Sequence, residues 1–190
     1  IAIAIALTLV FAFAACGGTK TPTDANTATD ATSTYTNATE VLVTVFDAIA
    51  EESKFPVAGG DEENQSFEAP AKYAVEKADE LANAFALPEA QAANIEDAAT
   101  AMHAMMANNF SGAAYILKSD ADAKTFADDF AAGLNGRQWM CGMPEKYVVI
   151  GAGNCVITAF GLAVNIESVK TAATTALTGA IVLAEGDITE

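Results

Sequence analysis

Few of the 190 residues carry side chains that commonly form covalent bonds or hold metal ions. The chain has three cysteines, Cys16, Cys141 and Cys155, and one histidine, His103. The histidine stands in the run Met102-His103-Ala104-Met105-Met106, and thioethers beside an imidazole can bind Cu(I). Methionine is also the usual filler of irregular cores, and a copper site usually draws on several separated clusters. We therefore expect no metal site and no cofactor.

Cys16 follows an uncharged run, residues 1–15, that is apolar apart from Thr8 and ends in Phe13-Ala14-Ala15. The run has the length of a signal-peptide core, about 7–15 residues, and is short for a membrane-spanning helix, which needs about 20. It resembles a bacterial lipoprotein signal, with Phe13 where leucine is usual. We expect residues 1–15 to be a signal peptide whose basic n-region is missing, and Cys16 to carry the lipid. An ordinary secretory signal and a buried core helix are the alternatives.

Residues 16–39 are predicted to form a flexible tether behind the lipid. They are rich in Thr, Ala, Asn, Asp and Ser, with Tyr35 as the one large apolar side chain. Such a segment cannot bury enough surface to offset the entropy lost on ordering. The formal charge of −16, from 25 acidic and 9 basic residues, opposes nucleic-acid binding. We expect contact with the membrane through the lipid, and a single folded domain over residues 40–190.

Apolar spacing predicts two helices at the start of this domain. The first is expected over residues 39–53 with Thr39 as its cap, and the second from Pro70 to near Leu87. Residues 90–106 are rich in Ala and Met and are compatible with a helix or with extended chain.

The second half of the domain alternates between strand and helix patterns. We predict a strand at 111–117, a helix capped by Asp120 or Asp122 and closed by Asn135-Gly136, and a hairpin of 146–150 with 154–160. A helix is expected at 166–176, and 180–183 is either a last strand or the end of that helix. This order predicts an α+β fold with an antiparallel sheet and helices on one face, ferredoxin-like in its β-α-β-β-α(-β) half.

No motif in the chain predicts catalytic residues. Gly151-Ala152-Gly153 starts like a dinucleotide-binding turn, but Val156 stands where the third glycine is required and a strand pattern follows. The sequence has no Gly-x-Ser-x-Gly elbow and no Ser-x-x-Lys. Two carboxylates meeting in the fold could still cleave a glycoside. Cys141 and Cys155 could form a disulfide outside the cytoplasm or remain two buried thiols.

Residues 105–160 resemble a family of uncharacterised lipoproteins from clostridia and related bacteria. The similarity lies in MMANNFSGAAYILKSDADAKTFADDF, in RQWMC and in GAGNCVITAFG. The resemblance implies a lipobox, a tether and one small α+β domain, and it brings no known activity.

Trp139-Met140-Cys141 is the most distinctive local match to that family. Trp139 is either a packing anchor or part of the rim of a ligand groove. The other candidate rim residues are Met140, Met102, His103, Met105 and Met106. We expect a lipid-anchored extracytoplasmic module that binds a partner protein, a wall polymer or a small ligand. A cell-wall hydrolase that uses a carboxylate pair is the alternative.

Overall fold

The computed structural model describes residues 34–189, with gaps at 120, 136 and 141. The predicted signal peptide, Cys16 and residues 17–33 of the predicted tether lie outside the described residues. Among the described helices, none has the length and apolar character that a membrane span requires.

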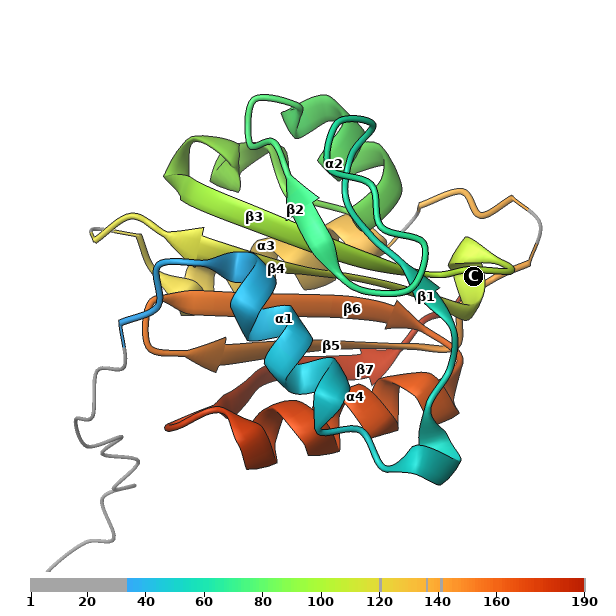
Figure 1. The fold of residues 1–190 in the computed structure, drawn as a ribbon. Helices are drawn as coiled ribbons and strands as arrows, with labels where there is room; N and C mark the ends of the chain where they lie inside the picture. Colours follow the sequence, from blue (N-terminus) through green and yellow to red (C-terminus); the bar gives the residue numbers. More distant parts are fainter. Residues whose placement is uncertain (1–33, 120, 136, 141, 190) are drawn as a thin grey trace, which may run out of the picture. The chain divides into compact units, whose positions relative to one another are not determined.

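An antiparallel sheet forms the centre of the fold (Figure 1). The strands lie in the order β1-β3-β4-β6-β5-β7, and β2 pairs with β3 beside β1. Their bounds are Val57–Ala58 (β1), Ala71–Tyr73 (β2), Ile95–His103 (β3), Phe110–Leu117 (β4), Lys146–Ala152 (β5), Cys155–Gly161 (β6) and Ile181–Asp187 (β7). The predicted hairpin is confirmed as β5 and β6. The sequence left open the conformation of 90–106 and of 180–183; the first contains the strand β3, and the second leads into the strand β7.

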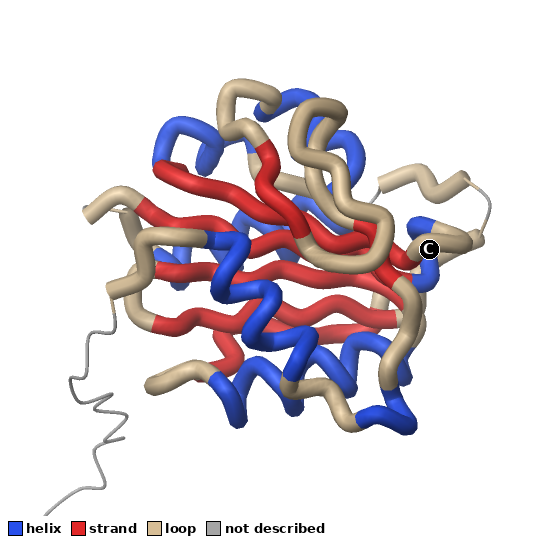
Figure 2. Tube along the Cα trace, viewed as in Figure 1, coloured by secondary structure: helices blue, strands red, loops and turns tan. Residues whose placement is uncertain are grey.

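Helices cover both faces of the sheet (Figure 2). Helices α1 (Ala38–Asp47) and α4 (Ala163–Ala176) pack on one face, and α2 (Ala78–Phe85) and α3 (Ala123–Leu134) pack on the other. Short 3-10 turns lie at Glu51–Ser53, Glu89–Asn94 and Ala107–Asn109. The α+β fold is therefore confirmed, but the expectation of helices on one face is wrong. Every residue of β4 and of β6 is buried, so neither face can be left to water.

The strand order also differs from the ferredoxin-like order. In that order the last strand would pair with the first strand of the unit, which here is β4. Instead β7 pairs with β5, and the free edge of β4 is taken by β3. The nine-residue β3 comes from the segment that the sequence left open, and its presence moves the final strand to the opposite edge of the sheet.

Two predicted helix bounds at the start of the domain need correction. Helix α1 begins at Ala38, because the Asn37 side chain rather than Thr39 caps it. The helix expected from Pro70 is split into the strand β2 and the later helix α2. Its start alternates, with Ala71 and Tyr73 buried and Lys72 exposed, which is the pattern of a strand. In the second half, α3 is capped by Asp122 as one of the two predicted alternatives.

A buried carboxylate holds the connection between β1 and β2. One Asp61 oxygen accepts hydrogen bonds from the Asn64 backbone (3.0 Å) and side chain (2.7 Å), and the other accepts one from the Ala74 N–H at 2.8 Å. Burial by itself raises the pKa of Asp61, but these hydrogen bonds together outweigh it and leave the pKa below its ordinary value. The ionised form of Asp61 is therefore part of the folded state.

We predict that the stabilising effect of Asp61 disappears in acid. Because its pKa is lowered on folding, the effect is complete above the unfolded pKa of about 3.9 and is lost as pH falls through the folded value. Asp61→Asn should lower the free energy of unfolding by about 1–3 kcal/mol at neutral pH. Urea denaturation measured across pH tests this, with the exposed Asp128→Asn as control. If the free energy of unfolding of Asp61→Asn differs from that of wild type by the same amount down to about pH 2, the prediction is contradicted.

Candidate functional site

Trp139 is a packing anchor. Its ring lies 5.2 Å from the Phe160 ring and 5.2 Å from the Arg137 guanidinium carbon, measured between centres. Arg137 in turn donates to the carbonyls of Ala82 (3.1 Å) and Asn83 in the last turn of α2. Burial lowers the pKa of the Arg137 guanidinium. Arg137 therefore joins the α3–β5 connection to the end of α2, and the indole packs between Arg137 and Phe160 on β6.

The other predicted rim residues lie at the same end of the sheet but do not enclose a groove. Met102 packs against the core beneath α2 and α3. The His103 ring stacks on Phe55 at 5.9 Å, and its Nδ1 accepts a hydrogen bond from the Met105 N–H at 3.1 Å. The side chains of Met105, Met106 and Met140 are exposed. These residues fall on two faces of the sheet and on the surface, and other residues line the grooves described below.

Of the two alternatives predicted for the cysteines, the structure shows a free thiol at Cys155. Cys155 is a free thiol, fully buried at the start of β6, and burial raises its pKa to about 12. Cys141 lies outside the described residues. Cys155 is paired with Ile116 near the last residue of β4.

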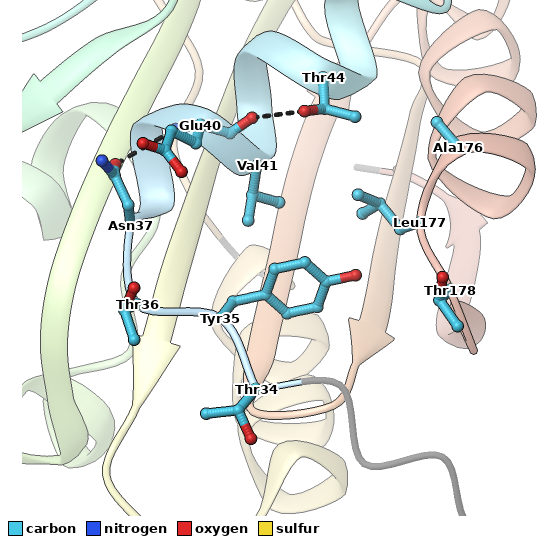
Figure 3. Close-up of a pocket in the computed structure, with 10 residues that line it drawn as sticks. All are labelled: Thr34, Tyr35, Thr36, Asn37, Glu40, Val41, Thr44, Ala176, Leu177 and Thr178. Carbon is cyan, nitrogen blue, oxygen red and sulfur yellow. Dashed lines mark hydrogen bonds between the residues drawn. The ribbon is translucent and has the colours of Figure 1, made fainter.

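A groove opens between the first turn of α1 and the end of α4 (Figure 3). Its volume is about 280 Å³. Most of its lining side chains carry a hydroxyl, amide or carboxylate group, above an apolar floor. They are Thr34, Tyr35, Thr36, Asn37, Glu40, Val41, Thr44, Ala176, Leu177 and Thr178. We call this the end groove.

Asn154 fixes the segment that forms one side of the end groove. Its Oδ1 accepts from the Tyr35 N–H at 2.7 Å, and its Nδ2 donates to the Tyr35 carbonyl at 2.9 Å. The Ala38 N–H donates to Asp97 on β3 at 2.8 Å. Gly153, with φ of +56°, makes the tight turn that presents Asn154. The described residues 34–39 are thus docked on the domain, and the predicted start of the domain at residue 40 is too late.

The cap of α1 orders the polar rim of the end groove. The Asn37 side chain accepts from the N–H groups of Thr39 (3.0 Å) and Glu40 (3.2 Å). Glu40 stands in the first turn, where a carboxylate is stabilised by the helix dipole. The Thr44 hydroxyl donates to the Glu40 carbonyl at 2.7 Å and keeps its lone pairs for another donor. Figure 3 shows the Tyr35 ring between Val41 and Leu177.

The end groove suits binding rather than proton transfer. Glu40 is the one titratable carboxylate in its lining, and none of the lining residues is cationic. Glycoside cleavage needs two carboxyl groups about 5–9 Å apart, and such a pair is not found among these residues. In the described ranges there is also no group of three or more His, Cys, Asp or Glu side chains placed to hold a metal ion.

A second groove lies at the other end of the same two helices. It is lined by Ala48, Ile49, Ala50, Ser53, Val164, Glu167, Ser168, Thr171 and Ala172, with a volume of about 450 Å³. Its lining is mainly apolar and includes the largely exposed Val164. Helices α1 and α4 therefore leave a polar opening at one end of their contact and an apolar opening at the other.

Comparison of the chain with protein-family models, curated proteins and solved structures finds no match. The resemblance to clostridial lipoproteins therefore stays a prediction.

Sequence reasoning missed Tyr35 and Asn154 as site residues. Tyr35 was assigned to the tether because its neighbours are small and polar. The sequence pattern places Asn154 at the start of the predicted strand 154–160 and gives it no other role. The contact between Tyr35 and Asn154 joins residues 119 positions apart. The one feature of the sequence that could have indicated it is Tyr35 itself, an isolated aromatic residue within a polar segment.

We predict that Asn154→Ala releases residues 34–37 from the domain. Both hydrogen bonds to the Tyr35 backbone are lost, so the free energy of unfolding should fall by about 1–3 kcal/mol. Hydrogen exchange at Tyr35 and proteolysis next to it should accelerate. The exposed Asn83→Ala is the matched control. Unchanged hydrogen exchange at Tyr35 in the Asn154 variant contradicts the prediction that Asn154 holds residues 34–37 on the domain.

Proposed function

We propose that the chain is a lipid-anchored, extracytoplasmic binding module that holds its ligand in the end groove. Support for the anchor comes from the sequence, in the apolar run that ends at Ala14-Ala15-Cys16. Support for the module comes from a domain whose groove is rich in hydrogen-bonding side chains and holds a single carboxylate.

The site and the tether meet at Tyr35. Residues 17–33 of the chain, if extended, would span several tens of ångströms at about 3.3 Å per residue. That reach would let a lipidated Cys16 stay in the membrane while the groove contacts material outside it. Because Asn154 fixes Tyr35, the tether would join the domain at a firm point beside the groove.

The chemistry of the end groove favours a neutral, hydroxyl-rich ligand. Tyr35 offers a ring on which the apolar face of a sugar can lie, and Thr44 and Asn37 offer acceptors and donors beside it. The formal charge of −16 repels anionic polymers. This combination of an aromatic ring, hydroxyls and no cationic side chain carries the proposal. Among the classes expected from the sequence, it supports an uncharged wall saccharide.

The alternative of a cell-wall hydrolase gains no comparable support. The adjacent Glu96 and Asp97 line a further groove near α1, together with Lys72. Both oxygens of Asp97 are engaged, one by the Ala38 N–H and one by the Lys72 ammonium at 3.5 Å. Asp97 is therefore occupied in holding the start of α1 and Lys72 against β3, and neither of its oxygens is left for a substrate.

We predict that Cys16 is the lipid attachment site. In the bacterium of origin, labelled palmitate should enter the wild-type protein and partition it to the membrane fraction. Cys16→Ser should abolish both, since a hydroxyl does not replace the thiol in thioether formation, while Cys155→Ser keeps the label. Label that persists in Cys16→Ser, or that never appears in wild type, rejects the anchor.

We predict that neutral N-acetylglucosamine oligomers bind the end groove of the full chain in detergent. Titration followed by NMR should shift the signals of Tyr35, Thr44 and Thr178. Thr44→Val removes one hydroxyl without changing side-chain size and should weaken binding about two- to tenfold, the net value of one hydrogen bond. Thr175→Val on the exposed side of α4 is the matched control. No shifts in the groove, or equal binding of an anionic wall polymer, contradicts the proposed ligand class.

A further inference from the structure

All five methionines of the chain gather at one end of the sheet. Three lie in or just after β3, and two lie in the connection between α3 and β5: Met102, Met105, Met106, Met140 and Met143. Four of them are exposed, by 83% for Met105, 46% for Met106, 82% for Met140 and 40% for Met143. Filling of an irregular core, the interpretation favoured from the sequence, therefore accounts for Met102 alone.

Hydrogen bonds hold the two methionine-bearing segments beside each other. The Asn108 side chain donates to the Met140 carbonyl at 2.7 Å and also to the Gly142 carbonyl. Asn108 is two residues from Met106, inside the turn that the Asn109 N–H closes on the Met106 carbonyl at 3.0 Å. Both segments are visible at the same end of the sheet in Figure 1. A second methionine-bearing segment therefore lies beside the first.

The first segment is also attached firmly to the body of the domain. The Ala104 N–H donates to the Pro56 carbonyl at 3.0 Å, and the Leu162 N–H donates to the Asn109 carbonyl at 2.9 Å. The Ser111 hydroxyl donates to the Ala107 carbonyl at 3.1 Å. The thioethers of Met105 and Met106 are thus carried on a fixed turn, which lowers the entropy lost when a ligand brings them together.

We propose that this cluster binds a soft monovalent cation, Cu(I) or Ag(I), through at least one thioether from each segment. Thioethers prefer such ions over Zn²⁺ or Mg²⁺, which favour nitrogen and oxygen ligands. The His103 imidazole is not one of the ligands, because its Nδ1 accepts the Met105 N–H and its ring is stacked on Phe55. The formal charge of −16 raises the local concentration of cations.

The site is independent of the end groove, which lies at the opposite end of the sheet: Asn154 beside Tyr35 follows β5, whereas Met143 precedes it. It revises the expectation from the sequence that the chain binds no metal. The two segments are separated by β4 and α3 along the chain, and only the fold shows that they meet.

Titration with Ag(I) tests the proposal in the full chain in detergent, with Cys16→Ser and Cys141→Ser so that these thiols do not compete. Cys155 is fully buried and stays as it is. Methionine methyl signals are observed by ¹³C NMR. We expect saturable shifts of Met105, Met106, Met140 and Met143 near one equivalent of Ag(I). Zn²⁺ should leave these signals unchanged.

Leucine variants separate thioether ligation from mere apolar character. Met105→Leu combined with Met140→Leu keeps the surface apolar and should weaken Ag(I) binding at least about tenfold, since even loss of an outer partner of a metal ligand costs that much. Met102→Leu is the matched control and should bind Ag(I) as wild type does. Undiminished binding in the double variant overturns the proposal, as does the absence of saturable shifts. Binding of a protein partner that survives in the double variant, without Ag(I) shifts, would show an apolar docking surface instead.

Discussion

The structure depends on the need to cover both faces of the central strands. Antiparallel sheets often leave one face to water, but β4 and β6 are buried along their whole length. On β4, Ile116 contributes to the core under α1 and α4, while its neighbour Tyr115 contributes to the core under α2 and α3. One sheet therefore needs two layers of helices. The contact between α1 and α4 in one of those layers is where the two grooves open.

Small side chains set how closely α1 approaches the sheet. Ala99 on β3 is paired with Ala114 on β4, and Ala101 is paired with Gly112. The three alanines belong to the core that includes Val41 and Val45 of α1. Alanine is compatible with helix and strand alike, so residues 95–103 gave no decisive local pattern. Their strand conformation comes from pairing with β4, which a local reading of the sequence does not include.

The elements that were predicted correctly carry strong local signals. Asp122 caps α3, and Gly153 makes a turn between two β-branched strands. The candidate site was predicted less well, since its parts are joined over long distances by single side chains. Asn154 reaches back to Tyr35, and Arg137 reaches α2.

Packing does not explain why the exposed positions at this end of the sheet hold methionine. Among the described residues, the two cores are built from Phe, Tyr, Leu, Ile, Val, Ala and Cys155, and Met102 is the one methionine that packs against them. Full burial of a methionine would contribute about 1.5–3 kcal/mol, a gain that Met105 and Met140 do not use. Leucine would serve equally well on an apolar surface that only docks a partner, and polar residues would serve better in an exposed turn. What methionine alone adds there is a thioether, and Asn108 brings the segments that carry those thioethers together.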